Sequence, residues 1–136
     1  MNRRMVMLGA IASTLPVPAL AQTDEPLALE RLITEVVAGG DVSVLPDLVA
    51  EDASLPDFNV AGIDALTAAT ESGHQNREKR YSEYEFTIQA IAESGDWQLA
   101  YVRLTGTTTE GQSEDIPGFY AARLVDGLIA ELFIGQ

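Results

Sequence analysis

The second half of the chain has the alternating pattern of apolar and polar residues that is typical of β-strands. Phe86, Ile88 and Ala90 are separated by single residues, a spacing that puts them on one side of an extended chain. Asp126-Gly127 lies between two apolar runs and is a strong hairpin signal, because both residues tolerate the positive φ of a tight turn. The pattern therefore predicts four successive strands in an antiparallel sheet, within residues 84–91, 97–107, 119–124 and 128–134.

The first half has the three- and four-residue spacing of helices. Between Leu29 and Val37 this spacing predicts a helix with one apolar face, which can cover the sheet. Thr23 or Asp24 is expected to cap its N-terminus, and Gly39-Gly40 is expected to end it.

Two more helices are predicted before the sheet. Asp41 or Ser43 caps the second helix, which closes at Glu51-Asp52, and residues 53–55 then begin a short strand. The third helix runs from about Ile63 to Ser72, because a glycine follows it and a polar run comes next.

Two segments are predicted to lie outside regular structure. Residues 74–80 are polar, and residues 109–118 contain too much glycine, serine and acid for the interior of a strand. The order of helix, helix, short strand, helix and four strands favours an α+β fold. We therefore expect a cone-shaped fold (an α+β barrel), in which a strongly curved, mostly antiparallel sheet packs on three N-terminal helices. The open end of such a cone is a favourable place for a ligand cavity.

The N-terminal residues are patterned as a signal peptide. A short basic head precedes an apolar run that is too short to span a bilayer, and Ala19 and Ala21 are small residues at the cleavage positions. Residues 1–21 are then a signal peptide, and residues 22–136 are one domain in the periplasm or outside the cell. Sec export is expected, although Arg3-Arg4 also fits a twin-arginine signal. The alternative is an N-terminal anchor helix.

The charge of the chain excludes several kinds of partner. The chain has 8 basic and 21 acidic residues, and two basic residues but no acidic ones lie in the predicted signal peptide, so the mature chain has a net charge of −15. Such a surface repels phosphate backbones and anionic lipids, which argues against nucleic acid and membrane surfaces as partners. The absence of cysteine excludes disulfides and lipoprotein processing.

Several segments resemble a known family. The turn at residues 91–96, the strand that ends at residues 104–107 and the hairpin at residues 123–131 are similar to the SnoaL-like polyketide and ester cyclases of the nuclear transport factor 2-like superfamily. The turn at residues 38–41 adds to the resemblance, which spans nearly all of the mature chain. It implies a cone-shaped fold that binds a small molecule, needs no cofactor and forms a homodimer.

The resemblance implies a fold more strongly than it implies a reaction. The family's cyclases often have histidine at the position of Thr108 and arginine at the position of Tyr101. An aldol-type cyclisation needs a base and a group that stabilises the resulting charge. The sequence therefore leaves open whether the protein is an enzyme.

Three residues are candidates for the base of a proton-transfer reaction. His74 is the only histidine and titrates near neutral pH, although its polar context also fits a solvated loop residue. Asp57 precedes the third helix near the expected cavity mouth, where aspartate is also a common turn or cap residue. Glu131 is a candidate if it is buried, and is otherwise a surface residue. One histidine, no cysteine and scattered carboxylates do not support a metal site.

Three other residues are candidates for ligand contacts. Tyr101 and Arg103 share one face of their strand. If that face lines the cone, they place a donor and a cation inside it; otherwise they meet solvent or a dimer partner, and Val102 and Leu104 fill the interior. Tyr120 is the candidate on the next strand, where it lies on the opposite face from an arginine, so that only one of the two is interior.

Two hypotheses for the function follow. The first is an exported SnoaL-like domain that binds a small apolar ligand in a conical pocket, with cofactor-free proton transfer of the cyclase or isomerase type if it is catalytic. The second is a non-catalytic ligand-binding or dimeric interaction module that has lost the cyclase residues.

Overall fold

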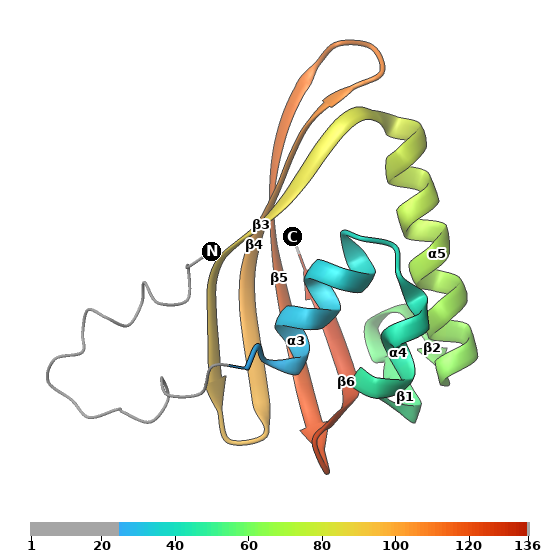
Figure 1. Cartoon of the computed structure of the whole chain (residues 1–136), viewed down its shortest axis with the longest axis vertical. Helices are drawn as coiled ribbons and strands as arrows, with labels where there is room; N and C mark the ends of the chain where they lie inside the picture. Colours follow the sequence, from blue (N-terminus) through green and yellow to red (C-terminus); the bar gives the residue numbers. More distant parts are fainter. Residues whose placement is uncertain (1–24, 136) are drawn as a thin grey trace, which may run out of the picture.

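The protein consists of a curved sheet with helices on one side (Figure 1). The computed structural model describes residues 25–135, and the predicted signal peptide and the predicted caps Thr23 and Asp24 lie outside the described residues. Within residues 25–135, no helix is both long enough and apolar enough to cross a membrane.

The helical segments lie on the side toward which the strands curve (Figure 1). The first predicted helix exists, but its second part is a π-helix. The predicted cap of the second helix is confirmed, because the side chain of Asp41 accepts a hydrogen bond from the amide of Ser43. The segments are α3 (Ala28–Arg31), η2 (Leu32–Val37), η3 (Val42–Val44), α4 (Leu45–Leu48), η4 (Pro56–Phe58) and α5 (Ile63–Arg80).

Helix α5 is longer than the sequence predicted. It continues through Gly73 and ends only at Arg80. A glycine inside a helix costs about 1 kcal/mol, and a tertiary contact opposes this cost, since the guanidinium of Arg77 lies 5.0 Å from the ring centroid of Phe86. The predicted stop at Gly73 and the predicted loop over residues 74–80 are therefore wrong.

The sheet has six strands and is open, with β2 and β3 at its edges. The predicted antiparallel order of the last four strands is confirmed, and β1 adds a parallel pairing with β6. The α+β class is thus confirmed, while the sheet does not close into a barrel. In spatial order the strands are β2 (Val60–Ala61), β1 (Val49–Leu55), β6 (Leu128–Gly135), β5 (Ser113–Val125), β4 (Trp97–Thr108) and β3 (Tyr81–Ser94).

The turn between β5 and β6 has the conformation that the sequence predicted. Asp126 has φ of 55° and Gly127 has φ of 84°, which are the left-handed values of a tight hairpin turn. This turn fixes the register of the two strands, so that Arg123 pairs with Glu131.

Two strands begin earlier than predicted. Strand β1 starts at Val49, so Glu51-Asp52 belongs to a strand and does not close a helix. Strand β5 starts at Ser113, which pairs with Thr107, so most of the predicted loop over residues 109–118 is strand. Its acidic residues are compatible with a strand because two of them form ion pairs with arginines.

A β-bulge in β3 changes which residues face the helices. The register shifts between Ile88 and Ala90 and leaves Gln89 without a paired residue. Phe86 and Ile88 pack against the core as predicted. Ala90, however, lies on the outer face, and Ile91 packs against the core in its place.

The core lies between the inner face of the sheet and helices α3 to α4. Its sheet side is formed by alternate residues of the central strands, as expected for a sheet with one buried face. The fully buried side chains from both layers include Leu29, Ile33, Val36, Leu45, Val49, Val102, Ala122 and Ile129.

Candidate functional site

A cavity of about 590 Å³ lies between α5 and the inner face of the sheet. It adjoins the main core, because Leu32, Val102 and Leu132 belong to both (Figure 1 shows α5 and the sheet). Most of its lining is apolar and comes from α5, η2, η4 and residues of all six strands. The apolar side chains that line it include Leu32, Leu66, Phe86, Val102, Leu104 and Leu132.

Tyr120 is one of the few polar residues in this cavity. Its side chain projects from β5 to the inner face and the residue is only 7% exposed. Burial raises the pKa of the Tyr120 phenol, and the nearby Arg77 lowers this pKa by a smaller amount. Among the described residues, its hydroxyl has no hydrogen-bond partner. Tyr120 is therefore a neutral donor that faces a mostly apolar space.

Arg77 reaches the same cavity from α5. Its Nη2 donates a hydrogen bond of 2.6 Å to the carbonyl of Val37, and its guanidinium stacks on Phe86. Its Nε is buried and has no acceptor among the described residues. The guanidinium also interacts with the hydroxyl of Tyr84. It is therefore held in place by uncharged partners, which do not neutralise its charge.

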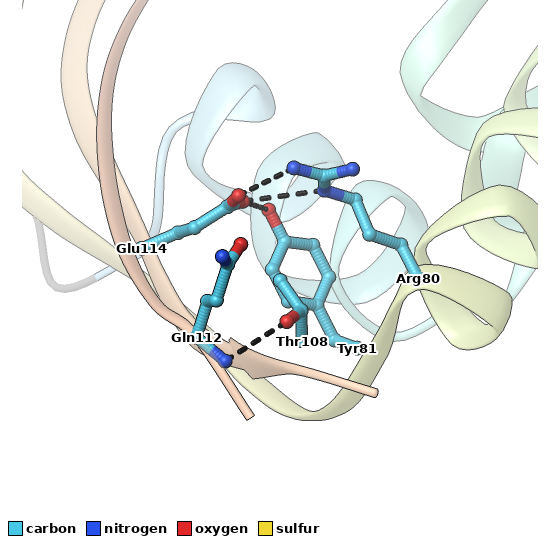
Figure 2. Close-up of polar contacts among 5 residues, drawn as sticks. All are labelled: Arg80, Tyr81, Thr108, Gln112 and Glu114. Carbon is cyan, nitrogen blue, oxygen red and sulfur yellow. Dashed lines mark hydrogen bonds and ion pairs between the residues drawn. The ribbon is translucent and has the colours of Figure 1, made fainter. Parts of the chain in front are cut away.

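A polar cluster forms the rim of the cavity at the C-terminal end of α5 (Figure 2). Both Arg80 and Tyr81 line the cavity and donate hydrogen bonds to the carboxylate of Glu114, with 2.6 Å between the Tyr81 hydroxyl and the Glu114 carboxylate. These hydrogen bonds, first from Tyr81 and then from Arg80, lower the pKa of Glu114. In the same view the amide of Gln112 donates to the hydroxyl of Thr108 and closes the β4–β5 turn (Figure 2).

This cluster joins α5 to the long β4–β5 hairpin. Glu114 lies on β5, whereas Arg80 and Tyr81 lie at the junction of α5 and β3. A backbone hydrogen bond from the amide of Thr109 to the carbonyl of Arg80 adds a second link. These contacts hold the hairpin near the C-terminal end of the helix (Figure 1).

Tyr101 and Arg103 lie on the outer face of the sheet, away from the cavity. Arg103 donates hydrogen bonds of 2.7 Å to Asp115 and to the hydroxyl of Tyr101. The inner face at these positions is occupied by Val102 and Leu104. Of the two alternatives for this face, the structure has the outer one, because the apolar neighbours in the strand take the buried face.

Of the predicted bases, His74 and Glu131 do not line the cavity. The ring of His74 packs against Gly40, and its Nδ1 lies 3.5 Å from the hydroxyl of Tyr84. Glu131 lies on the outer face, where it accepts a hydrogen bond of 2.8 Å from Arg123. Both side chains thus have structural contacts outside the cavity.

Asp57 lies in η4, at the boundary between the cavity and the outer face of the sheet. Its neighbour Phe58 lines the cavity, whereas Asp57 itself lines a groove on the outer face. The predicted position near the cavity mouth is therefore approximately right, but Asp57 is not part of the cavity lining.

The outer groove has a volume of about 640 Å³ and an apolar floor. Leu99 and Phe119 are exposed there, and the ring of Tyr101 lies 5.0 Å from that of Phe119. Trp97 and Phe133 form a second aromatic pair at one end of this face. Exposed apolar residues gathered on one face are typical of an interaction surface.

Within residues 25–135, no group of three or more histidine, aspartate or glutamate residues could hold a metal ion.

The sequence reasoning missed Arg77, because it placed residues 74–80 in a loop. Leu66, Thr70, Gly73 and Arg77 recur at steps of three and four residues, which puts them on one face of a helix. All four line the cavity. Extension of the helical pattern past Gly73 would have revealed that an arginine shares the cavity face.

Solved structures with the same fold come from several bacteria. A proposed polyketide cyclase from Bacillus cereus ATCC 10987 has 24% identity over 79% of this chain and 70% of its own, with a TM-score of 0.63. A proposed SnoaL-like polyketide cyclase from Jannaschia sp. CCS1 has 20% identity over 83% of this chain and 89% of its own, with a TM-score of 0.63. A protein with a ketosteroid isomerase-like fold from Catenulispora acidiphila DSM 44928, solved with trimethylamine, has 13% identity over 82% and 85%, with a TM-score of 0.62.

These identities are low, so the structural similarity shows the fold alone. No curated protein matches the chain. The sequence profile of the SnoaL-like domain, however, matches residues 29–132, which is most of the chain and includes most of the residues that line the cavity and the outer groove. The chain therefore belongs to the SnoaL-like domain family and has the nuclear transport factor 2-like fold.

Proposed function

We propose that the protein binds a small, largely apolar molecule in the cavity beneath α5. The observation that carries the proposal is a space of about 590 Å³ with a mostly apolar lining. Pockets that hold drug-sized ligands have volumes of roughly 300–1,000 Å³ and combine apolar walls with a few well-placed polar groups. Phe86, Leu104 and Leu132 would provide the apolar contacts.

Tyr120 would orient the ligand in this cavity. Its neutral hydroxyl projects from a buried residue, has no partner among residues 25–135, and can donate one hydrogen bond to a ligand. A ligand with a carbonyl or ether oxygen near Tyr120 would accept this hydrogen bond. We therefore expect an oxygen-containing ligand rather than a pure hydrocarbon.

Ligand binding has more support than catalysis. The hydroxyl of Tyr120 is suited to stabilise an oxyanion, which favours a proton-transfer reaction as the second candidate function. However, none of the described residues that line the cavity is a carboxylate or a histidine. The candidate base Asp57 lies on the other side of η4 and would have to move to reach the cavity. A binding or carrier role needs no such movement.

A matched pair of substitutions on α5 tests the binding proposal. Ala69 lines the cavity and is exposed, so Ala69→Phe should obstruct the entrance without disturbing the core. Ala68→Phe adds the same ring at an exposed position that does not line the cavity. Nile red, a neutral apolar dye, should fluoresce strongly with the wild type and with Ala68→Phe, but weakly with Ala69→Phe. Equal fluorescence from the two variants would refute the proposal.

We also propose that two copies of the chain associate through the outer groove. Its lining is mostly apolar, and Asp57 is the one charged residue among the described residues that line it. An apolar groove with a single carboxylate at its edge can pack against a second copy with less charge repulsion than the acidic surfaces elsewhere on the protein would produce. Leu99 and Phe119 would supply the apolar contact area.

Export remains part of the proposed function. The sequence of residues 1–21 supports a cleaved signal peptide, and the absence of cysteine is compatible with an oxidising compartment. The protein would then bind its ligand in the periplasm or outside the cell. Comparison of the N-terminal sequence of the protein recovered from the periplasmic fraction with that of the full chain tests the predicted cleavage after Ala21.

A further inference from the structure

We propose that the natural ligand of the cavity carries a carboxylate, and that Arg77 binds it. The inference rests on the proposed binding function and adds the chemical class of the ligand. It assigns the charged end of an otherwise apolar molecule to the guanidinium of Arg77 and its apolar body to the wall formed by Phe86 and Leu104.

Arg77 differs from the other arginines of the described chain in its partners. Within residues 25–135 it is the arginine that has no ion pair with a carboxylate. The chain is rich in acid, so a free carboxylate would be easy to supply from the protein itself. The other four arginines have such partners: Arg31 with Glu35, Arg80 with Glu114, Arg103 with Asp115 and Arg123 with Glu131.

The hydrogen bonds of Arg77 leave donors available. A guanidinium has five N–H groups, and within residues 25–135 Arg77 donates from Nη2 to the carbonyl of Val37 and also interacts with the hydroxyl of Tyr84. Its Nε–H is buried without an acceptor, which is unfavourable for a charged group. A carboxylate that bound side-on would accept two parallel hydrogen bonds and neutralise the charge.

The position of Arg77 is not explained by the end of the helix alone. Cations in the last turn of a helix stabilise the helix dipole, and Lys79 and Arg80 do so from exposed positions. Arg77 instead lies against the ring of Phe86, within electrostatic range of the Tyr120 phenol. Stacking on Phe86 fixes the plane of the guanidinium and leaves its edge for a ligand.

A carboxylate fits this environment better than a phosphate does. One guanidinium fork and one neutral hydroxyl, that of Tyr120, match the two oxygens of a carboxylate. A phosphate has a charge near −2 and needs more donors than these two side chains offer in a mostly apolar space. Arg80 is already neutralised by Glu114 at the rim and does not add a free charge.

The test compares ligands that differ only at one end. Octanoate, methyl octanoate and octyl phosphate are titrated calorimetrically into the mature protein at neutral pH, with wild type, Arg77→Met and Arg77→Lys. Arg103→Met is the matched control, because Arg103 lies on the outer face and does not line the cavity. Binding of methyl octanoate by a variant also reports that its cavity is folded.

The expected result is a loss of carboxylate binding alone. Arg77→Met should weaken octanoate by about tenfold or more, since a hydrogen-bonded charge is lost, and should leave methyl octanoate within about twofold. Arg77→Lys keeps the positive charge but loses the paired N–H donors of the guanidinium. Its affinity for octanoate should therefore lie between those of the wild type and Arg77→Met. Arg103→Met should bind both probes like the wild type.

Other outcomes separate this inference from the proposed function. If wild type binds the ester as tightly as octanoate and Arg77→Met changes neither, the carboxylate assignment fails while the binding proposal stands. Tighter binding of octyl phosphate than of octanoate would also overturn it. If wild type binds none of the three probes, both proposals fail. If Arg77→Met binds neither octanoate nor the ester, the result for Arg77→Lys decides. An equal loss of binding of both probes by Arg77→Lys overturns the assignment, and a selective loss of octanoate binding supports it.

Discussion

The side-chain oxygen of Gln98 accepts a hydrogen bond of 2.9 Å from the backbone amide of Leu29, 69 residues earlier in the chain. The amide of Leu29 lies in the first turn of α3, where backbone amides have no acceptor within the helix. Gln98 is a buried polar residue of the inner face, and its Nε2 donates to Glu93. This side chain thus fixes the start of the first helix to the central sheet.

We predict that Gln98→Leu destabilises the protein by about 1–3 kcal/mol, because it leaves the buried amide of Leu29 without an acceptor. Urea unfolding followed by circular dichroism measures the change in the free energy of unfolding. Gln89→Leu is the control, since Gln89 is exposed at the bulge of β3. Equal effects of the two substitutions would show that the bond from Leu29 to Gln98 adds nothing to stability.

Gly40 is expected to be intolerant of a side chain for two reasons. It has φ of 76°, and a Cβ there would lie 2.8 Å from Nε2 of His74. Gly95 has a similar φ of 59° but open space around it, so it isolates the backbone effect. Gly95→Ala should cost about 1–2 kcal/mol, and Gly40→Ala should cost more in the same unfolding assay.

The steric part of this effect can be tested in a double-mutant cycle. In a His74→Ala background the clash is gone, so Gly40→Ala should then cost about as much as Gly95→Ala. If the cost of Gly40→Ala is the same with and without His74, the proximity of the ring to Gly40 is irrelevant to stability.

Glu114 should make stability depend on pH. Hydrogen bonds from Tyr81 and Arg80 lower its pKa in the folded protein from the ordinary value of 4.5. The folded state therefore prefers ionised Glu114 more than the unfolded state does, and this contribution is present above about pH 4.5 and is lost as the pH falls through the lower folded-state value.

The measurement compares urea midpoints of wild type and Glu114→Gln across a series of pH values. The difference between them should be largest near neutral pH and should shrink below about pH 4.5. Glu110→Gln, at an exposed position in the β4–β5 turn, is the control and should follow the wild type. A gap between wild type and Glu114→Gln that widens in acid would contradict the assigned direction.

The outer groove predicts how the protein associates. Phe119→Glu and Leu99→Glu each place a charge on an exposed apolar residue of the groove and should shift a wild-type dimer to monomer in light-scattering chromatography. Val125→Glu changes an equally exposed apolar residue that does not line the groove, and should remain dimeric. A monomeric wild type at micromolar concentration would refute association through this face.

The sequence predicted those parts of the fold that are set by local chemistry. The Asp126-Gly127 turn needs left-handed φ values, and the residues themselves supply that tolerance. The apolar spacing of Leu29 to Val37 predicted a buried helical face in the same way. The failures occurred where a tertiary contact outweighed a local signal: Arg77 packs on Phe86 and supports α5 beyond Gly73.

The candidate site was less accessible from the sequence. The spacing showed that Tyr101 and Arg103 share a face, but not which face the helices cover, because both faces of β4 carry apolar residues. The bulge that places Ala90 on the outer face depends on one unpaired residue, Gln89. The sequence around Gln89 has no pattern that predicts this bulge. Arg77 lines the cavity because α5 continues past Gly73. The prediction that the helix ends at Gly73 therefore also missed Arg77 as a residue of the site.

The pairing of β1 with β6 has a consequence for how the molecule is made. Strand β6 lies between β1 and β5, so the helical half and the hairpin half of the sheet join only through it. A nascent chain that still lacks β6 has two exposed strand edges that cannot meet, and such long-range pairing is slow to form. The two halves of the sheet can therefore pair into one sheet only after synthesis has delivered β6, the last strand in the chain.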